Sequence, residues 1–211
     1  MNLIFDLDGV LLDTEKYYVD YWMEAARSFG YRFTRDMALG FRSLDHGLSN
    51  EIFKSYFGED ADVEAVRAKR IELMSNIEVV AKPYAKETAE YVKSHHISHC
   101  ICTSSSVEKA AKYLEIAGLS GLFDRIISAK GTPRGKPFPD PYLKACSVLG
   151  IEPKEAICVE DSPNGFQSAV QAGCQAIFAV DLTEPTPEIA SRALAVIHSL
   201  SELPAILESH L

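Results

Sequence analysis

The stretch Leu3-Ile4-Phe5-Asp6-Leu7-Asp8-Gly9 begins as an apolar run and ends in two carboxylates and a turn signal. A short apolar run that ends at a turn is typical of a strand buried in a parallel sheet. Similar runs recur along the chain and give the candidate strands 3–6, 99–103, 125–128, 156–160 and 176–180, with a weaker one at 194–197. Helical periodicity fills the intervals, at 84–93, 107–117, 141–149 and 164–172. This alternation predicts an α/β fold with a Rossmann-like parallel sheet.

One long segment departs from the alternation. Between residues 15 and 82 no strand-like run is found, and helical periodicity covers 17–29, 48–57 and 63–74. The segment follows the first strand closely, so we expect it to lie beside the carboxyl end of that strand. The sequence therefore predicts a core made of residues 1–14 and 83–211, with an inserted helical cap, residues 15–82, over an active site.

Polar side chains stand where three of the candidate strands end. Asp6 and Asp8 follow the first strand, hydroxyl residues 103–106 follow the second, and Glu160 and Asp161 end the fourth. In an open parallel sheet, ligands bind beyond the carboxyl ends of the strands. Carboxylates gathered there are stable together only if a cation or shared protons compensate their charge. Oxygen ligands favour Mg²⁺, which we expect as the cofactor.

A lysine is expected at the same edge of the sheet. Lys136 lies between Gly135 and Pro137, in a stretch too rich in proline to be a helix interior. A positioned ammonium beside a metal ion is what a phosphate dianion requires before a carboxylate can attack it.

Each of these features has an ordinary explanation when taken alone. Asp8-Gly9 is a common turn signal, and Asp161-Ser162-Pro163 is typical of a helix start. The serines at 104–106 suit a helix cap, and Lys136 suits a solvated loop. Four unrelated caps and turns have no reason, however, to fall in this order at successive strand ends, so we favour a common site.

In combination these stretches resemble the four motifs of haloacid dehalogenase-like phosphatases. DLDGVLLDT at residues 6–14 looks like the first motif, and Ser104 with its neighbours looks like the second. GKPFPD at 135–140 looks like the third and VEDSPNG at 159–165 like the fourth. The match extends over nearly the whole chain and implies a phosphoric monoester hydrolase with a helical cap.

The resemblance also implies catalytic and phosphate-binding roles. Asp6 would attack phosphorus as the nucleophile, and Asp8 would act as general acid and base towards the leaving alcohol. The phosphoryl oxygens would be held by Ser104, the Ser105 amide and Lys136. Thr103 competes with Ser104 for the hydroxyl position of the second motif, and we favour Ser104.

Metal and distal contacts follow from the same resemblance. Mg²⁺ would be bound by Asp6, the carbonyl of Asp8 and Asp161, with Glu160 close by. Arg42 resembles an arginine that some relatives use to hold the distal part of the substrate. A solvated surface arginine is the alternative for Arg42.

Two related enzyme classes compete with hydrolysis. Sugar phosphomutases of the β-phosphoglucomutase type are the main alternative, but these relatives place a histidine where this chain has Tyr18. Dehalogenases lack the second aspartate and need no metal, so Asp8 and Asp161 count against that class. We therefore expect a phosphatase acting on a small phosphorylated metabolite, of the sugar or polyol phosphate class, through an aspartyl-phosphate.

Composition limits the partners and the location. The chain has 30 Asp plus Glu against 21 Lys plus Arg, a net charge of −9, and no basic run, which argues against a nucleic-acid ligand. It shows neither a signal peptide nor an apolar run long enough for a membrane span, so we expect a cytoplasmic protein with no membrane partner. The five cysteines are odd in number, and Cys100, Cys102, Cys158 and Cys174 lie in or beside apolar strand-like runs, which favours buried reduced thiols over disulfides.

Overall fold

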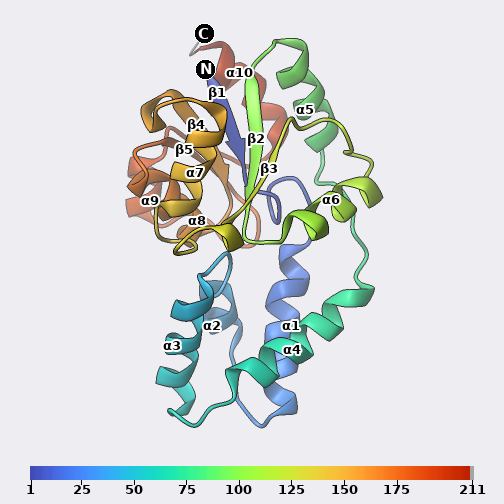
Figure 1. The fold of residues 1–211 in the computed structure, drawn as a ribbon, viewed down its shortest axis with the longest axis vertical. Helices are drawn as coiled ribbons and strands as arrows, with labels where there is room; N and C mark the ends of the chain where they lie inside the picture. The colour runs from blue at the N-terminus through green and yellow to red at the C-terminus, as the bar shows by residue number, and fades with distance from the viewer. Residues whose placement is uncertain (210–211) are drawn as a thin grey trace.

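The computed structural model describes residues 1–209 and has six strands in one sheet (Figure 1). The order across the sheet is β3-β2-β1-β4-β5-β6, and every neighbouring pair is parallel. The strands are β1 (Asn2–Phe5), β2 (Ser98–Thr103), β3 (Ile126–Ser128), β4 (Ala156–Glu160), β5 (Gln175–Ala179) and β6 (Ala195–Ile197). The predicted α/β fold is confirmed, and each strand agrees with its expected range to within about one residue at either end.

Both faces of the sheet are covered by helices. Leu3 and Phe5 of β1 belong to one apolar cluster, whereas Ile4 between them belongs to another on the opposite face. The first cluster includes side chains of α5 (Ala85–Ser94), α6 (Val107–Ile116) and α10 (Leu203–Glu208), and the second includes those of α7 (Asp140–Leu149) and α8 (Pro163–Gln171). The strands are apolar on both sides because neither face meets water. The remaining core elements are α9 (Pro187–Arg192) and the 3₁₀ turns η2 (Ala129–Gly131), η3 (Pro153–Glu155) and η4 (Leu200–Glu202).

Residues 15–82, called the insert below, contain helices and no strand. The insert holds α1 (Glu15–Ser28), α2 (Arg35–Gly40), α3 (His46–Phe57), α4 (Val63–Leu73) and the 3₁₀ turn η1 (Met74–Asn76). An apolar cluster of its own, which includes Trp22, Phe33 and Phe53, joins these helices. Figure 1 shows them beyond the end of the sheet towards which β1 points.

Helix α2 was not predicted from the sequence. With 6 residues the helix is too short to show an apolar repeat, and its start depends on a local contact. The Thr34 side chain caps it by accepting a hydrogen bond from the Met37 amide at 3.3 Å.

The cysteines lie in the interior of the protein. All five cysteines are buried free thiols, as expected, and burial raises the pKa of the Cys100 thiol to about 12. These thiols are therefore protonated at neutral pH and serve as small apolar side chains. None of the helices in the described part of the chain has both the length and the apolar character needed to cross a bilayer.

The fourth strand and the helix after it make one very close approach. The Ser162 hydroxyl caps α8 by accepting a hydrogen bond from the Gly165 amide at 3.1 Å. A Cβ atom on Gly165 would lie only 2.0 Å from Oε2 of Glu160. The Glu160 carboxylate cannot easily move aside, because it is fully buried and accepts hydrogen bonds from Lys136 and Tyr142. Glycine is therefore needed for α8 to begin beside the end of β4.

We predict that Gly165→Ala lowers the free energy of unfolding by about 1–3 kcal/mol, the usual cost of an added methyl group in a filled interior. Urea denaturation measures this change. Gly40→Ala is the matched control, because a Cβ atom there meets no atom within 4 Å. The control should be neutral or more stable than the wild type by about 0.4–1 kcal/mol. Equal stability of Gly165→Ala and the wild type would show that the Glu160 carboxylate can give way.

Candidate active site

The ends of two neighbouring strands, β1 and β4, bring the acidic residues together. Because β1 lies between β2 and β4, the carboxyl ends of these strands are neighbours, and the strand order reverses at β1. Asp6 directly follows β1, and its amide donates to the Val159 carbonyl at 2.9 Å. Glu160 is the last residue of β4, and Asp161 follows it. One carboxylate oxygen from each of Asp6, Glu160 and Asp161 lies within 4.8 Å of the other two.

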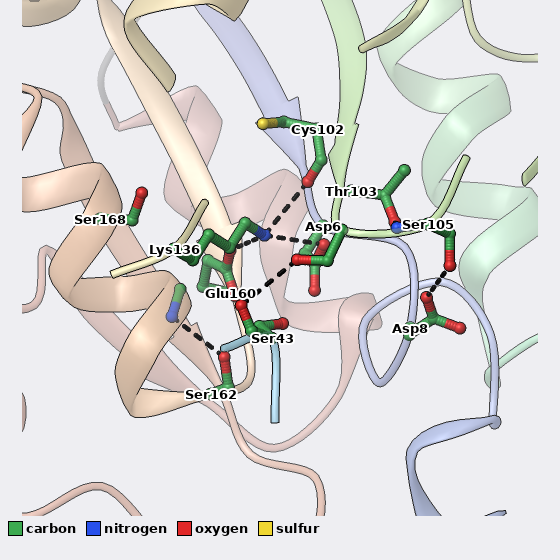
Figure 2. Close-up of polar contacts among 12 residues, drawn as sticks. Asp6, Asp8, Ser43, Cys102, Thr103, Ser105, Lys136, Glu160, Ser162 and Ser168 are labelled. Atoms are coloured by element: carbon green, nitrogen blue, oxygen red, sulfur yellow. Dashed lines mark hydrogen bonds and ion pairs between the residues drawn. The ribbon is translucent and has the colours of Figure 1, made fainter. Parts of the chain in front are cut away.

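A buried lysine stands among these carboxylates. Lys136 lies between η2 and α7 and is 0% exposed. Its Nζ is 2.9 Å from Oδ1 of Asp6 and 2.5 Å from Oε1 of Glu160, and it also donates to the Cys102 carbonyl at 3.2 Å (Figure 2). The Tyr142 hydroxyl donates to the same Glu160 oxygen. Lys136 is therefore an internal cation of the site and not a solvated loop charge, and Glu160 holds it in place.

The acidic residues keep oxygen atoms available for a further cation. Within residues 1–209, Oδ2 of Asp6, Oε2 of Glu160 and Oδ1 of Asp161 are buried and accept no hydrogen bond. Burial and the negative charge of Glu160 raise the pKa of Asp6 to about 7, although Lys136 acts in the opposite direction. Crowded carboxylates with free oxygens are the ligand set that Mg²⁺ prefers, so the residues present fit this ion.

Asp8 lies apart from this group and is held by two hydroxyls. Thr14 Oγ1 donates to Oδ1 of Asp8 at 2.5 Å, and Ser105 Oγ donates to Oδ2 at 3.2 Å. Figure 2 shows the Asp8 side chain turned towards Ser105 and away from Lys136. The carboxyl group of Asp8 is thus positioned separately from that of Asp6, as different roles for the two residues would require.

The loop after β2 presents one hydroxyl to the insert. Ser104 is partly exposed and lines the cavity described below, and its Oγ donates to the Ser43 carbonyl at 3.3 Å. Thr103 is fully buried, and its Oγ1 accepts a hydrogen bond from the Ser105 amide at 3.0 Å. Of the two residues that compete for the hydroxyl position, Ser104 is therefore the one that a ligand can reach.

Arg42 lies inside the site and not on the surface. It is 3% exposed, and its Nη1 is 3.2 Å from Oδ2 of Asp161. Nη2 donates to Thr183 Oγ1 at 2.5 Å. The alternative of a solvated surface arginine is wrong, because the closed arrangement of insert and core buries the guanidinium. Its partner here is an expected metal ligand, so the contact differs from the distal substrate contact that the resemblance implied.

Glu15 is a buried acid in the site that was not predicted from the sequence. It is the first residue of α1 and is 3% exposed. Burial and the charges of Asp161 and Asp8 raise its pKa well above the usual range, against the effect of Arg42. Glu15 carries no local signal in the sequence, because a glutamate in the first turn of a helix is common at protein surfaces.

Hydrogen bonds from the insert connect it to the strand ends of the core. Asp45 Oδ2 accepts from the Gly135 amide at 2.7 Å, and the Asp45 amide donates to the Lys136 carbonyl at 2.6 Å. Asn164 donates through Nδ2 to the Arg42 carbonyl at 2.8 Å. These contacts join residues that are at least 90 positions apart, which is why no spacing in the sequence indicates them.

A cavity of about 1040 Å³ lies between the insert and the core. Asp6, Asp8 and Ser104 line it from the core, together with Lys109 of α6. Residues of the insert, among them Glu15, Tyr18, Arg67 and Arg70, line the other side. The nucleophile and the general acid expected from the sequence therefore share one ligand-sized space.

Comparison with known proteins agrees with this geometry. Residues 3–179 match the family model of the haloacid dehalogenase-like hydrolases. Hexitol phosphatase A of Escherichia coli is 32% identical over 209 residues, which cover 96% of this chain and 92% of that protein. A phosphorylated carbohydrates phosphatase of Thermotoga maritima is 28% identical over 98% of this chain and 90% of its own length. The crystal structure of a hydrolase from Pseudomonas syringae superposes with a TM-score of 0.88 at 22% identity, covering 99% of this chain and 98% of that one.

The family model covers far more than half of the chain, and the alignment with the E. coli relative covers nearly the full length of both proteins. The order of the motifs, the parallel sheet and the buried Asp6–Lys136 contact agree with that match. The chain belongs to the haloacid dehalogenase-like hydrolase family.

Proposed function

We propose that this protein is a Mg²⁺-dependent phosphatase that hydrolyses a small phosphorylated metabolite through an aspartyl-phosphate on Asp6. The observation that carries the proposal is the state of the Asp6 carboxylate. Lys136 holds its Oδ1 at 2.9 Å, while its buried Oδ2 has no hydrogen-bond partner and the residue lines the cavity. A fixed carboxylate with one unengaged oxygen suits nucleophilic attack on phosphorus.

The reaction would proceed in two displacements. An oxygen of Asp6 bonds to phosphorus, the bond from phosphorus to the ester oxygen breaks, and the carboxyl group of Asp8 protonates the leaving alcohol. Water then attacks the phosphorus, Asp8 takes its proton, and the bond to Asp6 breaks to release phosphate. Asp8 suits both proton transfers because Thr14 and Ser105 fix its carboxyl group.

Charge compensation supports the same reaction. Lys136 would offset charge on the phosphoryl oxygens, and the hydroxyl of Ser104 with the amide of Ser105 would donate to them. Mg²⁺ would be held by Asp6, Asp161 and the Asp8 carbonyl, with Glu160 nearby. It would neutralise part of the negative charge of the carboxylates and the phosphate, and so reduce the repulsion between them.

The substrate is proposed to be a sugar or polyol phosphate. The cavity of about 1040 Å³ has room for a small metabolite, and residues of both insert and core line it. Hydrogen bonds such as those of Asp45 and Asn164 hold the insert against the core, which suits a small ligand better than a polymer. The curated relatives that act on hexitol and carbohydrate phosphates support this class.

Tyr18 favours hydrolysis over phosphomutase chemistry. Its hydroxyl accepts a hydrogen bond from Lys109 and lies 3.4 Å from Ser105 Oγ. Burial, followed by the charge of Asp8, raises the pKa of this phenol well above its usual range, so it stays protonated. A neutral phenol cannot exchange protons near neutral pH as an imidazole can, and an aspartyl-phosphate beside it would pass its phosphoryl group to water.

We predict that Asp6→Asn lowers kcat by on the order of 10³-fold or more, because the amide keeps the volume but is a poor nucleophile. Phosphate release from sorbitol 6-phosphate with Mg²⁺ is the measurement. Asp20→Asn is the matched control, since Asp20 is exposed and pairs with Arg35 at 3.4 Å, and it should retain wild-type turnover. Turnover of Asp6→Asn close to that of the wild type would contradict the covalent role.

Activity should depend on Mg²⁺. We expect EDTA to reduce turnover by on the order of 100-fold, Mg²⁺ to restore it and Ca²⁺ to suppress it, because Ca²⁺ accepts looser coordination by carboxylates. Mg²⁺ should also raise the thermal midpoint, because an ion that binds only the folded chain stabilises it. An EDTA-treated enzyme that keeps full activity, with an unchanged midpoint on addition of Mg²⁺, would refute the metal site.

Product analysis separates hydrolysis from the mutase alternative. We expect free phosphate as the main product when a hexose 1-phosphate is supplied with a catalytic amount of the corresponding bisphosphate. Phosphorus NMR resolves free phosphate from hexose 6-phosphate. Predominant hexose 6-phosphate would show that the phosphoenzyme waits for a sugar, and the hydrolase assignment would then be wrong.

A further inference from the structure

The Arg42 side chain crosses from the insert to the end of β4. Its Nη1 lies 3.2 Å from Oδ2 of Asp161, its Nη2 donates to Thr183 Oγ1 at 2.5 Å, and its Nε donates to the Leu39 carbonyl at 3.3 Å. All three nitrogens of the guanidinium group are therefore hydrogen-bonded, two of them to the core. Because Arg42 is only 3% exposed, these partners determine its position and solvent does not.

The backbone on either side of Arg42 is attached to the core independently. Nδ2 of Asn164, in α8, donates to the carbonyls of Gly40 and Arg42 at 2.9 and 2.8 Å, and Ser104 Oγ donates to the Ser43 carbonyl at 3.3 Å. Ser43 has a φ of 55°, in the left-handed region that residues other than glycine rarely adopt. Such a conformation persists where the surrounding contacts determine it. A variant that changes only the Arg42 side chain should therefore keep the insert on the core.

The Asp161 carboxylate offers one oxygen to Arg42 and the other to a further cation. Oδ2 lies against Gly9, where a Cβ atom would overlap this oxygen. The carboxylate is thus confined between the Gly9 backbone and the guanidinium group. Oδ1 is buried and accepts no hydrogen bond from residues 1–209. A metal ion that binds Oδ1 would therefore share the charge of Asp161 with Arg42.

Formal charges give the sign of this effect. The three carboxylates of the site, when ionised, face two buried cations, so the group has a net charge of −1. Its members are Asp6, Glu160, Asp161, Lys136 and Arg42. A divalent ion would bring this charge to +1, whereas without Arg42 it would bring a charge of −2 to zero. Because uncompensated charge is costly in a buried site, the ion should bind less tightly while Arg42 is present.

Two further acids near the site do not reverse this conclusion. Burial raises the pKa of Glu15 well above its usual range, so this residue compensates Arg42 only weakly. Asp8 accepts hydrogen bonds from Thr14 and Ser105 and is turned away from Lys136 (Figure 2). The charge of Asp8 is present whether or not residue 42 is an arginine. A comparison of two proteins that differ at residue 42 therefore measures the effect of the guanidinium group.

We propose that Arg42 and Mg²⁺ oppose each other at Asp161, so that binding of the ion loosens the contact of the insert with the core and lets a ligand enter the cavity. Opposition of this kind is reciprocal, because the factor by which Arg42 weakens binding of the ion is the factor by which the ion weakens the contact of Arg42. Arg42 is then a positioning residue. The inference rests on the metal site of the proposed function, and it is tested without turnover.

Calorimetric titration of Mg²⁺ into protein freed of metal by EDTA and dialysis tests the opposition. We expect Arg42→Gln to bind Mg²⁺ about tenfold tighter than the wild type, because a like charge is removed beside the ion. Arg35→Gln is the matched control, since it removes the same charge from the insert at an exposed residue that pairs with Asp20 at 3.4 Å. The control should bind Mg²⁺ as the wild type does.

A second variant and a melting experiment separate the effect from damage to the fold. Thr183→Val removes the acceptor of Nη2 but keeps the charge of Arg42, so Arg42 should be held less firmly and Mg²⁺ should bind about threefold tighter than in the wild type. In EDTA, Arg42→Gln should melt at a lower temperature than the wild type, because Asp161 loses its partner. Mg²⁺ should nevertheless raise the midpoint of Arg42→Gln by more than that of the wild type.

Hydrogen exchange of backbone amides tests the loosening. The Gly135 amide donates to Asp45 Oδ2 and the Asp45 amide donates to the Lys136 carbonyl, so the contact of insert and core protects both amides. We expect saturating Mg²⁺ to accelerate exchange of these two amides severalfold in the wild type. In Arg42→Gln, which has no charge to oppose the ion, Mg²⁺ should cause no such acceleration.

Four outcomes decide the proposal. Equal or weaker Mg²⁺ binding by Arg42→Gln would overturn it, since Arg42 would then orient Asp161 for the ion. Exchange rates that Mg²⁺ leaves unchanged in the wild type would also overturn it. If neither protein bound Mg²⁺, the inference and the metal site of the proposed function would both be wrong. Tighter Mg²⁺ binding by Arg42→Gln, with no phosphate release by the wild type, would support the opposition and refute the phosphatase assignment alone.

Discussion

The site depends on one buried contact, the ammonium of Lys136 between Asp6 and Glu160. Removing an ammonium from water costs several kcal/mol, and only close carboxylates offset that cost. The contact therefore constrains its surroundings: Tyr142 of α7 shares the Glu160 oxygen, and Gly165 lets α8 pass beside it. With one Asp6 oxygen engaged by Lys136 and the other unbonded, the same contact that stabilises the buried charges also orients Asp6, the proposed nucleophile.

Parallel strands explain why most of this site was predictable from sequence. Asp6, Glu160 and Asp161 follow apolar runs directly, and neighbouring parallel strands end at one edge, so local sequence determines that the carboxylates meet. Lys136 was identified by its motif and by the unfavourable context for a helix. The six strands were predictable for the same reason, since sheet residues covered on both faces are continuously apolar.

The remaining features arise from contacts between the insert and the core. Arg42 lies 119 positions from Asp161, and its burial follows from how the insert seats on the strand ends. Glu15 resembles any glutamate in a first helical turn until the fold encloses it. α2 was missed because its 6 residues depend on a cap at Thr34 and on packing within the insert. Periodicity within a segment predicts the secondary structure of that segment alone. The burial and partners of these residues depend on contacts with a second segment.

Two stretches of chain connect the insert to the core. The two connections run side by side, where the Asp13 amide donates to the Val80 carbonyl at 3.0 Å and the Lys82 amide to the Leu11 carbonyl at 2.8 Å. A ligand held between residues of the insert and residues of the core, which line one cavity, would oppose separation of the two parts. Binding energy from the remote end would then favour the closed arrangement, in which Asp6 is shielded from bulk water. A contact far from phosphorus would in this way contribute to the reaction at phosphorus, because both ends of the ligand would hold the insert against the core.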